Sequence, residues 1–205
     1  EDILMAGAAL VGGLFAILLF TVLPTVLVGG LGKVVTLTRW PRVILEAVLK
    51  VAIFLSYMVA ISKMKEIHRV FEYHGAEHKT IACYEAGDEL TVENVRKYTR
   101  FHPRCGTSFL FVVLVLSILL FSIVQVDGIL LQMVCKLLLL PVLVGIAYEI
   151  NRYVGRHDNP VTRFVTAPGL WLQNFTTNPP DDSMIQVGIA SLKAVIPEKK
   201  GQDAW

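Results

Sequence analysis

Four long apolar segments constrain the fold more strongly than any other feature of this 205-residue sequence. They cover residues 3–31, 43–62, 108–126 and 129–150, and each is close to the ~20 residues that cross a hydrocarbon core about 30 Å thick. Inside a bilayer the backbone has no water to bond, so such a segment forms a helix. The sequence therefore predicts an all-α membrane protein with about four transmembrane helices, and the 54% hydrophobic composition agrees.

The polar stretches between these segments define the expected organisation. We expect four parts, which are transmembrane helices 1 and 2 in residues 1–62, a cytoplasmic motif segment in 63–107, transmembrane helices 3 and 4 in 108–150, and a cytoplasmic or interfacial tail in 151–205. Pro24 predicts a kink in the first span. In the tail, the apolar residues that follow "NPPDDS" recur at helical spacing and predict an amphipathic helix, on the membrane surface or on the other cytoplasmic pieces.

Two shorter helices are expected in the motif segment. Residues 63–86 predict a helix that could continue the second span, and Gly87-Asp88 should end it. Thr91 is a good N-cap residue for a short helix that reaches Tyr98. The three cysteines, Cys83, Cys105 and Cys135, are an odd number without framework spacing, which argues against a disulfide scaffold.

The distribution of lysine and arginine predicts the orientation. With four spans, both termini and the motif segment lie on one side of the membrane, and that side carries fourteen basic residues against three on the other (Lys33, Arg39 and Arg42). Because basic residues concentrate in cytoplasmic loops, we expect a multi-pass protein of the bacterial cytoplasmic (inner) membrane with both termini in the cytoplasm.

The stretch "EYHGAEHKTIACYE" carries the clearest chemical motif. His74, Glu77 and His78 form H-x-x-E-H, and on a helix the imidazoles at i and i+4 share a face and can reach one ion. Glu77 would flank the ion as general base for an attacking water rather than as a ligand. The pattern is similar to the inverted zinc motif of the inverzincin metallopeptidases. It predicts a divalent transition metal, with zinc first, although interfacial histidines bonded to Glu77 or to lipid would give the same pattern.

A catalytic zinc requires a third protein ligand and an open position. Glu149, at the end of the fourth span, is one candidate, and His102 with Cys105, in "FHPRCGTSF", is the other. His157 and Asp158 also follow the fourth span closely. The predicted topology brings all of these residues to one interfacial layer. Each also has a structural alternative, because His102 and Cys105 could cap a turn and Glu149 could pair with Arg152 or Lys136.

Three motifs, "YHGAEHKT", "FHPRCGTSF" and "NPPDDSMIQVGIASL", resemble those of the YqhQ-like bacterial membrane proteins. The resemblance covers most of the chain after about residue 60. It implies an inner-membrane protein of a family described as predicted metal-dependent enzymes, with His74, Glu77, His78, His102 and Cys105 at the motif positions. It also implies a glycine-rich segment before the first span, which this sequence lacks, so we expect a domain or a piece of the site to lie outside it.

Three classes of function follow from these features. The first is a metal-dependent hydrolase that acts on a membrane-anchored peptide or a lipid-linked phosphate. The second is a scaffold or partner-binding protein with a closed, structural metal site of four ligands. The third is a small transporter with Glu46, Lys50, Lys136 and Glu149 as polar path residues, which would require a homo-oligomer because four spans are few.

Charge and composition limit the classes of binding partner that the sequence predicts. The formal net charge is only +2, and the sequence does not show the alternation of aromatic and basic residues that is typical of nucleic-acid binding. The expected partners are membrane lipids and the substrate. Arg96, Lys97, Arg100 and Arg104 predict either a surface for lipid headgroups or a site for an anionic substrate.

Overall fold

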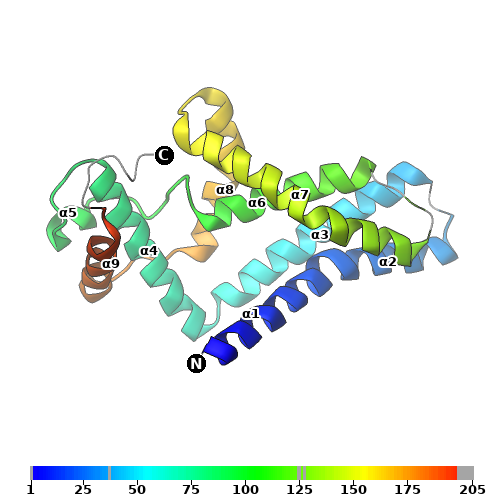
Figure 1. Cartoon of the computed structure of the whole chain (residues 1–205), viewed down its shortest axis with the longest axis horizontal. Coiled ribbons are helices and arrows are strands. Elements are labelled where there is room, and N and C mark those ends of the chain that lie inside the picture. Colours follow the sequence, from blue (N-terminus) through cyan, green and yellow to red (C-terminus); the bar gives the residue numbers. More distant parts are fainter. Residues whose placement is uncertain (1, 37, 124–125, 127, 198–205) are drawn as a thin grey trace. The chain divides into compact units, whose positions relative to one another are not determined.

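The computed structural model describes residues 2–36, 38–123, 126 and 128–197, and these residues are helical throughout apart from turns and loops (Figure 1). The elements, in chain order, are α1 (Asp2–Ile17), the π-helical turn η1 (Leu18–Val22), α2 (Leu23–Val34), α3 (Arg39–Ser62), α4 (Lys65–Glu85), α5 (Val92–Arg96), α6 (Gly106–Ile123), α7 (Ile129–Arg156), α8 (Pro160–Thr176) and α9 (Asp182–Val195). The prediction of an all-α fold is confirmed.

Four of the helical segments are long and apolar enough to cross a membrane, as predicted. They are Asp2–Gly32, Arg39–Ser62, Gly106–Ile123 and Ile129–Arg156. The third begins two residues before the predicted start, and residues 124, 125 and 127, at and after the predicted end of this span, lie outside the described residues. Gly128 follows with a φ of 95°, a conformation in the left-handed region that glycine adopts without strain.

The chain falls into two compact units. The first unit contains Glu1–Tyr57 and Val113–Ile146, and the second contains Met58–Val112 and Ala147–Trp205. Helices α3, α6 and α7 therefore contribute residues to both units.

In the first unit, α1 and α2 run on as one helical segment through η1 (Figure 1). Pro24 lies in the first turn of α2, directly after η1. Proline has no N–H to donate and crowds the carbonyl four residues earlier, and the wider π turn accommodates both effects. The irregularity predicted at Pro24 thus takes the form of a π-helical turn.

Of the two partners expected for Glu149, the structure confirms Arg152 and not Lys136. Lys136 is 1% exposed and its ammonium contacts Glu46, whereas Glu149 pairs with Arg152. Lys136 and Glu149 are thirteen positions apart on a single helix, about 20 Å along its axis, so their side chains cannot meet.

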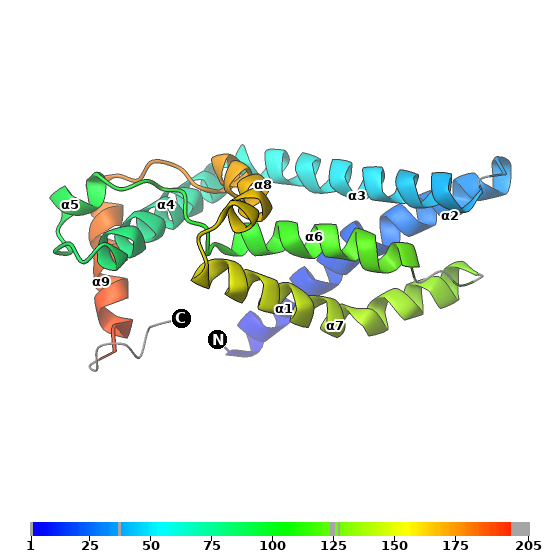
Figure 2. The same ribbon diagram turned by 90° about the horizontal axis from the view of Figure 1, so that it is seen from above.

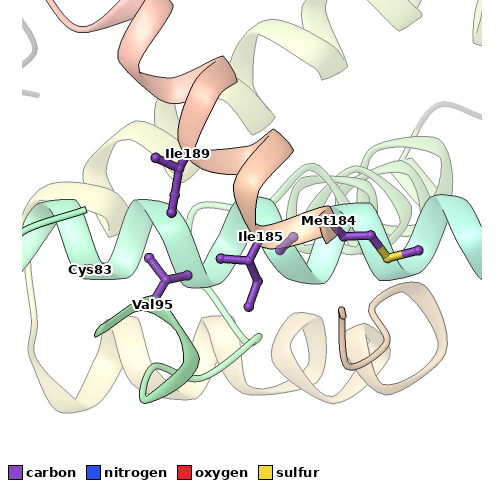
Figure 3. Close-up of a cluster of buried hydrophobic side chains, with 6 residues drawn as sticks. Cys83, Val95, Met184, Ile185 and Ile189 are labelled. Atoms are coloured by element: carbon purple, nitrogen blue, oxygen red, sulfur yellow. The ribbon is translucent and has the colours of Figure 1, made fainter. Parts of the chain in front are cut away.

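In the second unit, α4, α5 and α9 surround one small core (Figures 2 and 3). It contains the buried residues Ala76, Cys83, Val95, Met184, Ile185 and Ile189. The N-cap predicted at Thr91 is present, because the amide of Asn94 donates to its hydroxyl, and Asp181 caps α9 by accepting from the amide of Met184. Cys83 packs in this core as a free thiol.

Helix α4 does not continue the second span. Met64 has an extended backbone, with ψ 131°, and precedes the first residue of α4. The chain therefore turns after Ser62, and α4 begins as a separate helix that carries the histidine motif.

Helix α8 was not predicted. Asn159 caps it with a capping box shared with Thr162, and Pro160 occupies the first turn, where a missing N–H costs nothing. The helix continues through Pro168 and carries Trp171 as an exposed residue. Gly169 lets α8 approach the start of α6, since a Cβ there would lie 2.7 Å from the Ser108 side chain.

Gly75 permits the close approach of the segment between α8 and α9 to α4. A Cβ at this position would lie 2.1 Å from the carbonyl oxygen of Asn178, whose amide donates to Phe71 O at 2.8 Å. We expect Gly75→Ala to lower the free energy of unfolding by about 1–3 kcal/mol, as overpacking does. Thermal unfolding in detergent measures the effect. Gly145→Ala is the matched control, because a Cβ there meets no atom within 4 Å, and an equal loss of stability in both variants would contradict the prediction.

Candidate metal centre

Three side chains converge in the second unit. One ligand atom from each of His74, His78 and Cys105 lies within 4.8 Å of the other two. The histidines come from one face of α4, with ring centroids 4.3 Å apart, as their i,i+4 spacing predicts. Cys105 comes from the loop that directly precedes α6. Among the residues that the structure describes, this is the only such group of three.

Backbone carbonyls orient both imidazoles. Nδ1 of His74 lies 2.8 Å from Thr176 O, and Nδ1 of His78 lies 2.6 Å from Arg100 O. A carbonyl can only accept, so each Nδ1 carries a proton and Nε2 is the nitrogen left for other partners. Metal-ligating histidines are held in the same way, by an acceptor on the nitrogen that does not bind the ion.

Cys105 is buried and lies in an environment that stabilises its thiolate. Its Sγ lies 3.3 Å from His74 Nε2 and accepts a hydrogen bond from the amide of Thr107 at 3.3 Å. Burial alone would raise the pKa of Cys105, but the hydrogen bonds with His74 and His78 outweigh burial and lower this pKa to about 5. For His74, burial acts against protonation, yet the contact with Cys105 prevails and raises its pKa.

His102 lies beside this group rather than in it. Its ring centroid is 5.8 Å from that of His78, and its Nε2 is 3.2 Å from Glu85 Oε2. Burial lowers the pKa of His102, although the contact with Glu85 acts in the opposite direction. The other oxygen of Glu85 accepts from the Arg104 guanidinium, so Glu85 holds both residues.

The remaining candidates lie outside the group. Glu149 is 66% exposed and lies 3.7 Å from Arg152. His157 stacks on Tyr153, with ring centroids 4.2 Å apart, and Asp158 pairs with Arg163. Of the candidates for a third ligand, the structure thus brings only Cys105 to the two histidines.

Two cavities border the cluster. The first, of about 230 Å³, is lined by His74, His78, Cys105, Glu77, Glu85 and Arg104, among others. The second, of about 740 Å³, is a mostly apolar groove between α4 and α9. Glu77 is exposed and, like His74, lines both cavities. The carboxylate predicted as a base therefore faces the space that a substrate would occupy.

Gln173 was not singled out in the sequence, although it positions the loop that carries the cysteine. It is fully buried in α8, accepts from the amide of His102 at 2.9 Å, and donates to the carbonyl of the same residue at 2.7 Å. It also donates to the hydroxyl of Ser108 at 3.2 Å. The only signal in the sequence was a pair of amides, Gln173 and Asn174, inside the otherwise apolar "LWLQNF" run.

We expect Gln173→Leu to cost about 1–3 kcal/mol for each backbone group of His102 that it leaves buried without a partner. The loop from 101 to 105 should loosen, so the variant should also bind zinc more weakly than the unsubstituted protein. Thermal unfolding and zinc titration measure the two effects. Asn174→Leu, one position along α8 at an exposed residue, is the control, and an equal response in both variants would rule out a positioning role.

Helices of this length and hydropathy, together with an imidazole and thiolate cluster, define a helical membrane-associated protein with a candidate metal centre. The chain belongs to the family described as protein of unknown function DUF1385, whose model matches residues 1–198. This result agrees with the resemblance to the YqhQ-like proteins.

One similar relative is the uncharacterised protein YqhQ of Bacillus subtilis strain 168. The two chains are 37% identical over 153 residues, which is 74% of this chain and 48% of the relative. The chain therefore spans about half the length of the curated relative it matches. No solved structure matches. Neither description names a reaction or a metal, so metal-dependent chemistry stays a prediction.

Proposed function

We propose that the protein is a metal-dependent hydrolase of the bacterial cytoplasmic membrane that acts at the cytoplasmic interface. The observation that carries the proposal is the convergence of His74, His78 and Cys105 beside an open cavity. Three protein ligands and an open position are typical of catalytic zinc sites, whereas structural zinc sites are closed by four ligands.

The donor set fits zinc best among the divalent transition metals. Imidazole and thiolate are its common ligands, and the carbonyls that hold both Nδ1 atoms leave each Nε2 as the nitrogen that can bind metal. A proton that His74 shares with the Cys105 thiolate would be released when the metal binds. A bound zinc would polarise a substrate oxygen and lower the pKa of water in the site to about 7.

The chain itself supplies a base and a cation at the cavity wall. Glu77 immediately precedes the ligand His78 in α4 and lines the cavity, where its carboxylate can accept a proton from an attacking water. Arg104, held by Glu85, lines the same cavity and can stabilise negative charge that develops on a substrate oxygen. These roles match the parts that hydrolysis of an ester, an amide or a phosphate requires.

The apolar groove supports a membrane-derived substrate. Its walls include Val70, Ile81, Val187 and Leu192, and His74 and Glu77 lie where it meets the polar cavity. An acyl chain or an apolar peptide segment in the groove would bury apolar surface and place its polar end beside the ligands. The substrate class is therefore a lipid-linked phosphate or a membrane-anchored peptide.

The proposed function can be tested with labelled water. The purified chain, loaded with zinc, is reconstituted with bacterial lipid extract or with membrane-anchored peptides in water enriched in oxygen-18. We expect mass spectrometry to find labelled product with the unsubstituted protein and with Lys193→Met, which removes an exposed charge from α9. The product should be absent with Glu77→Gln. Label incorporation that is unchanged by Glu77→Gln and by chelation would contradict the proposal.

The alternative of a scaffold with a structural metal requires a fourth protein ligand. His102 is the candidate from the sequence, but its Nε2 contacts Glu85. Zinc absorption spectroscopy distinguishes the two functions, because four nitrogen and sulfur ligands would support the scaffold and three with one oxygen would support the hydrolase.

The proposed orientation places α5 and α9 in the cytoplasm. We expect cysteines introduced at the exposed positions Glu93 and Gln186 to resist a membrane-impermeant thiol reagent in intact cells and to react after lysis. Thr36→Cys, in the loop between α2 and α3, should react in intact cells. Labelling of position 93 or 186 from outside the cell would contradict the predicted orientation.

A further inference from the structure

The first unit contains a cluster of charged side chains that has no part in the proposed hydrolysis. Lys136 on α7 contacts Glu46 on α3 and donates to the Thr25 hydroxyl on α2 at 2.8 Å. Lys50 lies one turn after Glu46 on α3, with its ammonium 3.7 Å from the same carboxylate oxygen. Lys50 and Lys136 are 3% and 1% exposed, so both are removed from water.

The charges of this cluster do not balance. Lys136 and Glu46 form one pair in direct contact, which leaves Lys50 as an additional buried cation. The distance from Lys50 to Glu46 is too long for a normal hydrogen bond, and its ammonium otherwise faces the ring of Phe121 at 4.8 Å. An uncompensated buried charge costs several kcal/mol, so a second anion would stabilise the site.

Two cavities meet at this cluster. A small one, of about 20 Å³, is lined by Lys50, Glu46, Arg42, Ser122 and Gln132, and it is large enough for one water-sized atom. A larger one, of about 200 Å³, shares Arg42, Glu46 and Gln132 with it. Arg42, Glu46 and Lys50 follow one another at i, i+4 and i+8, so they lie on one face of α3.

Arg42 adds a second cation at the mouth of the site. It is exposed, and among the described residues its guanidinium forms no ion pair. A guanidinium binds the oxygens of phosphate in bidentate fashion, and a lysine ammonium binds them as a point charge. The amide of Gln132 supplies a neutral donor on the same wall.

The geometry points to an oxyanion site in which Lys50 and Arg42 bind a phosphate group, either that of a lipid headgroup or free phosphate. One phosphate oxygen occupies the small cavity beside Lys50, and the rest of the group lies in the larger cavity. Because the side chains of a helix lean toward its N-terminus, the Lys50 ammonium reaches toward Arg42, and one phosphate can approach both cations. The carboxylate of Glu46 lies on the same face of α3 between the two cations, and its contact with Lys136 offsets its negative charge.

The test uses the full chain, purified in detergent and stripped of lipid. Thermal unfolding is followed after addition of phosphatidylglycerol, phosphatidylcholine or inorganic phosphate, for the unsubstituted protein and for Lys50→Met, Arg42→Gln and Lys193→Met. Arg42 is exposed, so its variant should fold even if Lys50→Met does not. Lys193→Met repeats the lysine substitution at an exposed position of α9.

We expect phosphatidylglycerol to raise the melting temperature of the unsubstituted protein and of Lys193→Met, and Lys50→Met and Arg42→Gln to weaken this binding at least tenfold. A response to phosphatidylglycerol alone identifies a headgroup, and an added response to inorganic phosphate identifies a site that also takes the free ion. Lys50→Met should melt higher than the unsubstituted protein without any anion, because it removes the uncompensated charge. No response to either phosphate source, or an equal response in all variants, overturns the proposal.

Discussion

Replacing His74 with alanine should remove most of the metal from the purified protein, whereas replacing Glu77 with glutamine should leave the metal in place and abolish turnover. His74 supplies a ligand atom, so its loss leaves two donors. Glu77 is one residue from His78, roughly 100° around the helix, and flanks the site without replacing a ligand. An amide at position 77 preserves shape but cannot take a proton, and loss of a general base costs about 10²–10⁴ in rate.

Elemental analysis of the purified variants measures the first effect and oxygen-18 incorporation measures the second. His68→Ala is the matched control, since His68 lies on the same helix, is 54% exposed and pairs with Glu72. It should retain both metal and activity. If Glu77→Gln loses the metal as fully as His74→Ala does, Glu77 is a ligand. If Glu77→Gln keeps both metal and activity, the scaffold alternative is favoured.

Replacing Glu46 with alanine should be among the most destabilising changes in the chain. Lys136 would lose its only contact with a carboxylate among the described residues, and Lys50 would lose its nearest one. Removal of one partner of a buried ion pair costs about 3–5 kcal/mol, because it leaves the other charge without compensation. For a domain of this size, a shift of ~2–4 °C in melting temperature accompanies each kcal/mol.

The double variant Glu46→Leu with Lys136→Met tests the reason for that effect. Exchange of a buried ion pair for apolar residues of similar volume is often neutral or stabilising, so the double variant should melt well above Glu46→Ala. Glu149→Ala is the surface control, because its pair with Arg152 is largely exposed and contributes about 0–1 kcal/mol. A melting temperature for Glu46→Ala close to that of the unsubstituted protein would contradict the prediction.

The fold was largely predictable from the sequence because bilayer physics dictates the length and composition of spans. The four apolar helices begin and end within a few residues of the predicted positions, apart from the fourth, which continues to Arg156. The caps at Thr91 and Asp181 were recognisable from local chemistry alone. Helix α8 was missed because Pro168 and Gly169 break helices in most contexts, and here its approach to Ser108 outweighs that preference.

The site was predictable only where its geometry is local. The pairing of His74 with His78 follows from helical spacing, but the choice of Cys105 over His102 and Glu149 depends on tertiary contacts. The partners Thr176 and Gln173 lie about 100 and 70 positions from the residues they hold, beyond the reach of any pattern. For the same reason, the partner of Lys136 came from α3 rather than from its own helix.

The order in which the chain is synthesised limits when the metal centre can form. His74 is oriented by the carbonyl of Thr176, and the helix that carries it packs against Ile185 and Ile189 of α9 (Figure 3). A nascent chain that has already placed all four spans in the bilayer therefore still lacks the segment that arranges its ligands. If the proposed metal site is correct, metal loading would follow translation of residues 176–189, and an interrupted chain would enter the membrane without a metal-loaded centre.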